Sequence, residues 1–161
     1  MPRAKGDLPI PDSAPHAPSY SGRLIVCERT GQWAAALRRE LADAGLRLWE
    51  TRSLADAWDA LAATPAAFLV LELLPGTAGP LWARMAWLAH DFPRARAAVL
   101  APRRLAAHED LAREAGAVYF ACSPRRLAPL ARMIVRHLAS LPPPEQTLLE
   151  RIWASLPWGG N

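Results

Sequence analysis

Short apolar runs alternate with longer amphipathic stretches along the chain after residue 22. The five apolar runs span, in order, Arg23–Cys27, Leu46–Glu50, Ala67–Leu73, Ala97–Ala101 and Ala117–Cys122. Four of them are almost continuously apolar, as strands buried on both faces are. The second run alternates Leu46 and Leu48 with polar neighbours, which is typical of an edge strand. The pattern therefore predicts five strands.

The stretches between these runs carry helix signals. Thr30 is suited to cap the first helix, and Gly45 and Gly116 are stop signals after the first and the fourth. Ser53 and Asp56 fit a capping box at the start of the second. The predicted helices span approximately residues 30–44, 53–61, 80–88, 105–115 and 124–141.

Five repeats of strand and helix predict one parallel sheet with helices on both faces, because crossover connections are right-handed. For a chain of 161 residues we expect the doubly wound, flavodoxin-like α/β fold with strand order 2-1-3-4-5. A functional site in such a fold lies beyond the carboxyl ends of the strands.

Three segments at the predicted strand ends resemble the receiver domains of bacterial two-component response regulators. They are RLIVCER (23–29), FLVLELLPGTAG (68–79) and GAVYFACSP (116–124). The resemblance covers roughly residues 23–141 and depends on order and spacing as much as on identity. It implies a degenerate receiver domain, because nearly all of the family's active positions are altered.

Two of the altered positions concern the acidic pocket of the family. Glu72 stands where the resemblance places the phosphoacceptor aspartate. Glu28 matches one of the two magnesium-binding acids, and Arg29 replaces the other. Magnesium prefers several oxygen ligands in octahedral geometry, and a cation in place of one ligand repels it.

The remaining altered positions concern the switch. Ala101 replaces the switch threonine or serine, and Ser123 replaces the lysine that precedes Pro124. Phe120 falls at the aromatic switch position. Since phosphoryl transfer needs a metal and cations to neutralise the developing charge, we expect no phosphorylation, no metal site and no cofactor.

Glu72 itself admits two interpretations. It carries a negative charge farther from the backbone than aspartate does, and Arg29 on the neighbouring strand is close enough to pair with it. An ion pair between the two would lock the pocket in one conformation. The alternative is an inert, solvated cluster of drifted residues.

The composition and the spacing of charged, apolar, Cys and His residues argue against several classes of protein. The formal net charge is +4, but no compact run of basic residues interleaves with aromatics as in nucleic-acid-binding proteins. No apolar stretch reaches the ~18 residues of a membrane span, and the N-terminus lacks a signal core, so we expect a cytoplasmic protein. Cys27 and Cys122 are expected to be free thiols about 14 Å apart, since two strands intervene. The four histidines lack ligand spacing.

Two terminal segments lie outside the receiver-like unit of residues 23–141. Residues 1–22 are Pro-rich and aperiodic, which predicts a disordered tail. Residues 142–161 begin with a Pro linker and then carry an apolar stripe at helical spacing. The stripe consists of Leu148, Leu149, Ile152, Trp153 and Leu156. This amphipathic helix is expected to dock on its own domain, on a second copy or on another protein.

These features favour a phosphorylation-independent signalling module that binds a protein partner or itself and is not an enzyme. The predicted surface combines the fourth and fifth helices with the C-terminal helix. Its residues are Arg125, Arg126, Arg132, Arg136, Leu149, Ile152, Trp153 and Leu156. One alternative is a small flavodoxin-like enzyme or nucleotide binder that uses the strand-end crevice. Another is a receiver that is still phosphorylated on Glu72.

Overall fold

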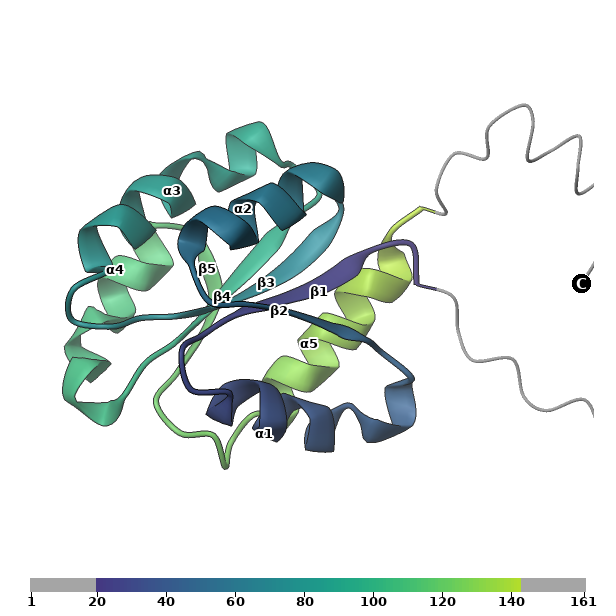
Figure 1. Cartoon of the computed structure of the whole chain (residues 1–161), viewed down its shortest axis with the longest axis horizontal. Coiled ribbons are helices and arrows are strands. Elements are labelled where there is room, and N and C mark those ends of the chain that lie inside the picture. Colours follow the sequence, from purple (N-terminus) through teal and green to yellow (C-terminus); the bar gives the residue numbers. More distant parts are fainter. Residues whose placement is uncertain (1–19, 143–161) are drawn as a thin grey trace, which may run out of the picture.

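The computed structural model describes residues 20–142. Its sheet has five parallel strands in the order β2-β1-β3-β4-β5 (Figure 1). The strands are β1 (Arg23–Cys27), β2 (Leu48–Thr51), β3 (Ala67–Glu72), β4 (Arg96–Leu100) and β5 (Ala117–Ala121). This confirms the predicted flavodoxin-like fold and its strand order.

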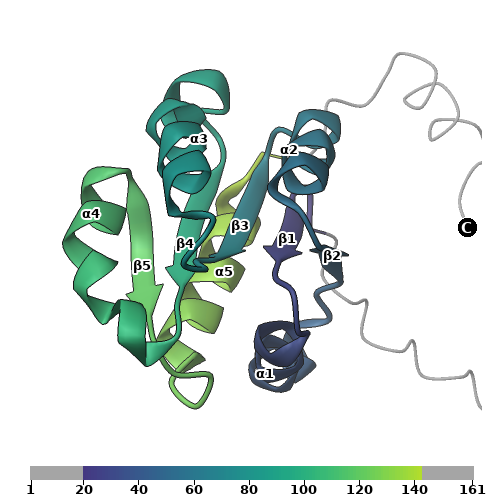
Figure 2. The same ribbon diagram turned by 60° about the vertical axis from the view of Figure 1, so that its left-hand side comes forward.

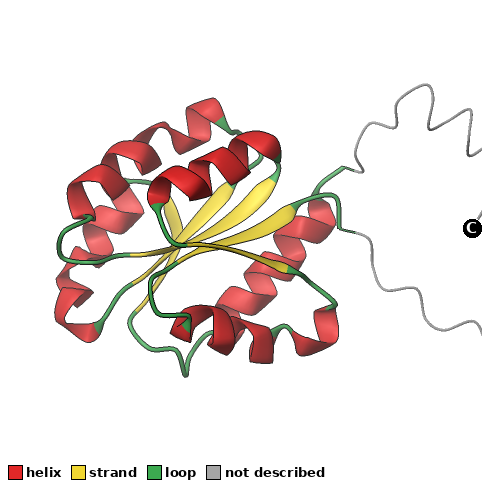
Figure 3. Cartoon of the chain, viewed as in Figure 1, coloured by secondary structure: helices red, strands yellow, loops and turns green. Residues whose placement is uncertain are grey.

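Helices cover both faces of the sheet, which gives three layers (Figures 2 and 3). The α-helices are α1 (Gln32–Glu40), α2 (Leu54–Ala63), α3 (Ala78–Asp91), α4 (Glu109–Glu114) and α5 (Ala128–Ser140), and two short 3₁₀ helices span Ala42–Ala44 and Arg103–His108. Helices α1 and α5 pack on one face, and α2, α3 and α4 pack on the other.

Successive side chains of a strand point to opposite faces of the sheet, so each strand contributes to the cores on both faces. In β1, Leu24 and Val26 join the core under α1 and α5, whereas Ile25 and Cys27 join the core under α2, α3 and α4. All residues of the central strand β3 are buried. Burial on both faces is the reason that these strands are recognisable as nearly continuous apolar runs.

Several helix boundaries differ from the predicted ones. Thr30 does not cap α1: the N-cap is Gly31, whose φ of 82° lies in the left-handed region and which has no side chain to offer. The predicted fourth helix is divided into the 3₁₀ helix at Arg103–His108 and α4. The Ser53 hydroxyl accepts a hydrogen bond from the Asp56 amide at 3.1 Å, which confirms the predicted cap of α2.

The first described residues lie beside the end of α5, close to the last described residues. Tyr20 packs against the core under α1 and α5, and Gly22 lies against the end of α5. The predicted boundary of the tail at residue 22 is therefore wrong, because residues 20–22 belong to the packed domain. The rest of the predicted tail, residues 1–19, and the predicted C-terminal helix lie outside the described residues. Between residues 20 and 142, no helix is both long and apolar enough to cross a membrane.

Candidate functional site

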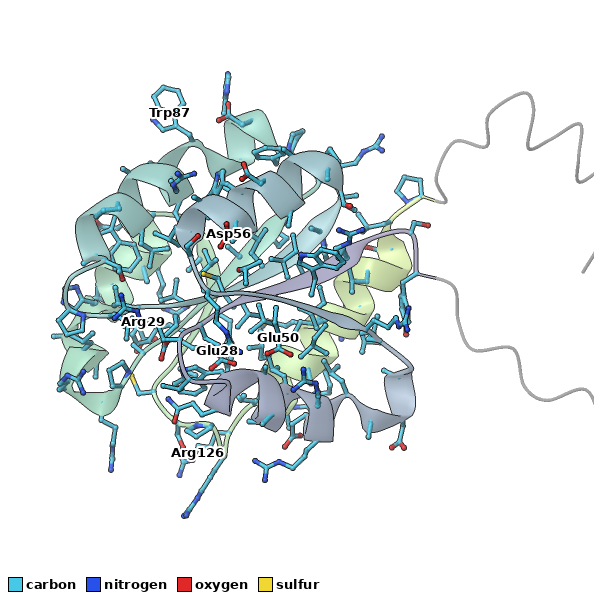
Figure 4. All side chains as sticks on the ribbon, in the orientation of Figure 1. Glu28, Arg29, Glu50, Asp56, Trp87 and Arg126 are labelled. Carbon is cyan, nitrogen blue, oxygen red and sulfur yellow. The ribbon has the colours of Figure 1, made fainter. Side chains whose placement is uncertain are left out.

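A cavity of about 200 Å³ lies at the carboxyl ends of β1 and β3. Its walls come from the end of β1, the loop before α2 and the loop after β3. The lining residues are Cys27, Glu28, Arg29, Arg52, Ser53, Leu54, Glu72, Leu74 and Thr77. The structure therefore brings together Glu28, Arg29 and Glu72, as the sequence predicts (Figure 4 labels Glu28 and Arg29).

Glu28 is 2% exposed and caps α1 with its carboxylate. One oxygen accepts the amide of Trp33 at 2.9 Å, and the other accepts the amide of Ala34 at 2.6 Å. The first amides of a helix have no partner within it, and Gly31 supplies no side-chain acceptor. A carboxylate at this end also interacts favourably with the helix dipole. Glu28 therefore serves as the cap that the sequence assigned to Thr30.

Glu72, the last residue of β3, is 9% exposed and holds two further N–H groups. It accepts the backbone amide of Arg29 at 2.8 Å and the indole Nε1–H of Trp33 at 3.3 Å. Trp33 is thus both a buried core residue and a hydrogen-bond donor to the pocket. The sequence pattern indicated only its place in the buried stripe of the helix.

The ion pair between Arg29 and Glu72, one of the two interpretations of the sequence, is not formed. The two residues are in contact, but through the Arg29 main-chain amide. The Arg29 side chain is exposed and forms no salt bridge with any residue between 20 and 142. Successive side chains of an extended segment point to opposite sides, so when Glu28 points inward Arg29 points outward. The guanidinium therefore does not fill the place of a metal.

Arg52 is a further site residue that the sequence did not indicate. Its Nη1–H donates to the main-chain oxygen of Glu28 at 3.1 Å, which ties the loop before α2 to the end of β1. An exposed arginine between a strand and a helix carries no signal of this contact in the sequence.

The other predicted switch positions do not join the acidic cavity. Ala101 is fully buried after β4, and its amide donates to the Ala121 oxygen at 2.9 Å. Phe120 is 8% exposed and packs in the core under α2, α3 and α4. Ser123 accepts the Arg125 amide at 3.3 Å within its own loop. Phe120 and Ser123 line a separate hollow of about 670 Å³ beside Arg103, Arg125 and Arg126.

The thiol of Cys27 lies in the wall of the acidic cavity. Burial raises its pKa above the ordinary value, and the nearby carboxylates of Glu72, Asp56 and Glu28 add to the rise. Cys27 is therefore a neutral, weakly nucleophilic thiol at physiological pH. Cys122 is also free, and burial likewise raises its pKa.

The residues of the cavity do not fit the magnesium ion of receiver domains. Magnesium requires several oxygen ligands in octahedral geometry. Both carboxylates here already accept two N–H groups each from α1 or its approach, and Arg29 offers no oxygen. In the described part of the chain, no three His, Cys, Asp or Glu side chains are grouped so that they could hold a metal.

The four arginines predicted to bind a partner belong to two surfaces. Arg125 and Arg126 lie in the loop between β5 and α5, where Figure 4 shows Arg126 projecting from the domain. Arg132 and Arg136 lie on α5 and line a groove beside the end of α1. The other predicted residues, Leu149, Ile152, Trp153 and Leu156, lie outside the described range.

Exposed apolar side chains concentrate at the β5 edge of the sheet. Of the five large hydrophobic residues that are exposed between residues 20 and 142, three lie on α4, β5 and α5. They are Leu111, Val118 and Met133, with exposed fractions of 42%, 38% and 40%. The other two, Trp49 and Trp87, lie on β2 and α3. We refer to Leu111, Val118 and Met133 as the β5-edge face.

The sequence matches no protein-family model and no characterised protein. The fold is similar to that of several solved structures. A response regulator from Thermotoga maritima superimposes with a TM-score of 0.57 at 17% identity, over 74% of this chain and 99% of its own. An orphan response regulator of H. pylori gives a TM-score of 0.60 at 17% identity, over 75% and 99%.

A response regulator from Burkholderia pseudomallei, solved with a phosphorylated aspartic acid and a calcium ion, gives a TM-score of 0.55. It is 22% identical over 83% of this chain and 71% of its own. At these identities the likeness establishes the fold. The chain is a receiver-like domain in its architecture, as the resemblance in the sequence implied.

Proposed function

We propose that this receiver-like domain is a signalling module that binds protein partners in one conformational state, without phosphorylation and without catalysis. The observation that carries the proposal is the arrangement of Glu28 and Glu72. Each carboxylate is buried and accepts two N–H groups of its own chain. The pocket is therefore complete without a metal or a phosphoryl group.

The groups that would respond to a phosphoryl group are also replaced. A receiver needs a cation beside the phosphoryl oxygens and a hydroxyl that moves toward them, and the matching positions hold Ser123 and Ala101. Ser123 is engaged by the Arg125 amide, and Ala101 is fully buried. The carboxylates of Glu28 and Glu72 are already held by N–H donors, and a fully satisfied polar network favours one conformation of the pocket over an equilibrium between two.

The β5-edge face is the surface that we assign to a partner. Its three exposed apolar residues lie on α4, β5 and α5, and the hollow along β5 that contains Arg125 and Arg126 has no acidic residue in its lining. Interfaces combine an apolar centre with a polar rim and are enriched in arginine. A partner, or a second copy of the chain, with an apolar patch bordered by acidic residues would match this face.

The acidic cavity at the ends of β1 and β3 is itself a poor fit for a nucleotide or for the substrate of an enzyme. Sites for small molecules usually enclose about 300–1,000 Å³, and this cavity encloses about 200 Å³. Its two carboxylates would also repel the phosphates of a nucleotide.

The proposal is tested by exposing the protein to millimolar magnesium with acetyl phosphate or beryllofluoride. We expect no gain in mass and no shift in the amide NMR spectrum, because the carboxylates are engaged and the lysine is absent. A triple variant, Arg29→Asp, Glu72→Asp and Ser123→Lys, restores three of the four altered positions and serves as the comparison, with Ala101 left unchanged. A magnesium-dependent gain of one phosphate on Glu72 of the unaltered protein would contradict the proposal.

A further inference from the structure

A groove of about 420 Å³ runs between the end of α1 and the outer side of α5. It is lined by Glu40, Leu41, Ala128, Ala131, Arg132, Val135 and Arg136. Its floor is formed by aliphatic side chains, and charged groups of both helices lie along its rim. This groove, which we call the α1–α5 groove, is separate from the acidic cavity and from the β5-edge face.

Helix α5 has more apolar surface than the sheet covers. Leu130, Ile134 and Leu138 are buried against the sheet. Ala128, Ala131 and Val135 form a second row at spacings of three and four residues, on the side of the helix that faces the groove. A row of this spacing is the surface on which another helix packs, and its two alanines admit a large side chain.

The sequence that follows α5 has the pattern of such a helix. Residues 145–156 carry the apolar stripe that includes Ile152 and Trp153. Residues 141–144 include three prolines, and connections of two to eight residues usually join neighbouring antiparallel helices. At a rise of 1.5 Å per residue, a helix over 145–156, which ends before Pro157, is about 18 Å long. Helix α5, with 13 residues, is about as long.

The charges of the two surfaces are complementary. The rim of the groove carries Arg132 and Arg136 against one acid, Glu40. The segment 145–156 carries Glu145 and Glu150 against one arginine. If the chain turns back at the proline run, Glu150 comes opposite Arg136, and Trp153 comes opposite the small residues near Arg132.

We propose that residues 145–156 fold back as an amphipathic helix and occupy the α1–α5 groove of the same molecule, antiparallel to α5. The proposal does not depend on the proposed function, since this helix would leave the β5-edge face open. It would also cover the parts of Ala128 and Val135 that stay accessible along the groove, whereas Ala131 is already buried.

The experiment measures trypsin cleavage after Arg151 in the full chain, by mass spectrometry, at several protein concentrations. Cleavage requires the segment to leave its groove, so its rate follows the undocked population. The double change Arg132→Glu and Arg136→Glu should raise the rate on the order of tenfold. Trp153→Ala should do the same. The matched control is Met133→Glu, which places a new acid on the opposite side of α5 and should leave the rate unchanged.

A second groove variant distinguishes loss of docking from loss of folding, in case the first variant does not fold. Ala128→Glu changes an exposed residue in the first turn of α5, where an acid interacts favourably with the helix dipole. It should raise the rate while circular dichroism and melting temperature stay those of the parent. Equal rates in the parent and both groove variants overturn the proposal, as does acceleration by Met133→Glu alone. Protection that increases with protein concentration also overturns it, because the segment then docks on another copy.

Discussion

At the scale of single residues, the acidic cavity depends on which atoms of Glu28, Arg29 and Glu72 meet. Each glutamate has a buried carboxylate with two N–H donors, whereas the Arg29 guanidinium is exposed. A buried acceptor is expensive to remove because its donors are left without partners. The three side chains therefore differ in their effect on stability, although they are adjacent.

The first prediction compares Glu28→Ala with Arg29→Ala. Glu28→Ala should lower the free energy of unfolding by about 1–3 kcal/mol, because two amides of α1 lose their acceptor. Arg29→Ala should change it by less than about 0.5 kcal/mol, since the amide that binds Glu72 is retained. Urea unfolding measures both values. A loss in Arg29→Ala as large as that in Glu28→Ala would show that the guanidinium is engaged in solution.

His137 is a second residue for which we expect an effect, in this case on how the stability of the fold depends on pH. Its ring packs edge-on against Phe68 with a centroid separation of 5.7 Å. Burial lowers its pKa, and the Arg96 guanidinium lowers it further, while contacts with the main chain of Ala67 and Arg94 oppose the shift. The folded protein therefore binds this proton less readily than the unfolded chain does.

The second prediction follows from that sign. The contribution of neutral His137 is fully present above its ordinary pKa of about 6.5 and is lost as pH falls through that value toward the lower folded pKa. The melting temperature of the parent should fall more between pH 7.5 and 5 than that of His137→Gln. If the slopes of the parent and of His137→Gln agree, His137 does not contribute.

At the scale of elements, the first residues of the domain are packed against the end of α5. A side-chain Cβ at Gly22 would clash with the Leu141 side chain and would lie 2.7 Å from the Ala66 oxygen and 2.8 Å from Leu138. These separations are shorter than van der Waals contact, and one neighbour is main chain that does not move easily. The entry to β1 and the exit from α5 are therefore coupled through one glycine.

The third prediction is that Gly22→Ala lowers the free energy of unfolding by about 1–3 kcal/mol, because the added methyl group overpacks this junction. Gly79→Ala is the matched control. It lies in α3 with open space around its Cβ, so it should be neutral or gain up to about 1 kcal/mol from helix propensity. Thermal unfolding compares the two, and equal stability of both variants would contradict the close contact.

At the scale of the whole molecule, the described surface has an acidic cavity at the strand ends and an apolar face at the β5 edge. The cavity is engaged by internal N–H groups, so a partner is expected at the edge. Leu111 and Met133 are 42% and 40% exposed, so replacing them should cost far less stability than replacing a core residue.

The fourth prediction concerns this face. The double change Leu111→Glu and Met133→Glu should reduce protein capture from the native host, or self-association in light scattering, by on the order of tenfold. Trp87→Glu replaces a more exposed apolar residue on α3 and should leave both unchanged. Each variant should keep the melting temperature of the parent. A loss that occurs with Trp87→Glu instead would place the interface on α3.

Much of the fold could be predicted because its signals are local. Strands buried on both faces leave apolar runs such as Ala67–Glu72. Five alternating strands and helices then favour the doubly wound fold with its usual strand order, which the structure has. The start of α1 could not be predicted in the same way. Its cap is the carboxylate of Glu28, and a hydrogen bond from a strand end to the next helix is not visible in the spacing of capping residues.

The candidate site also has features that the sequence predicts and features that depend on the folded chain. The sequence by itself determined which residues stand at the strand ends, and hence that Glu28, Arg29 and Glu72 meet, because parallel strands end at one edge of a sheet. Only the tertiary structure decided how they meet. The direction of the Arg29 amide and the reach of the Trp33 indole depend on the path of the chain from β1 into α1. Side-chain chemistry can be inferred from residue type, whereas the direction of a main-chain donor exists only once the chain is folded.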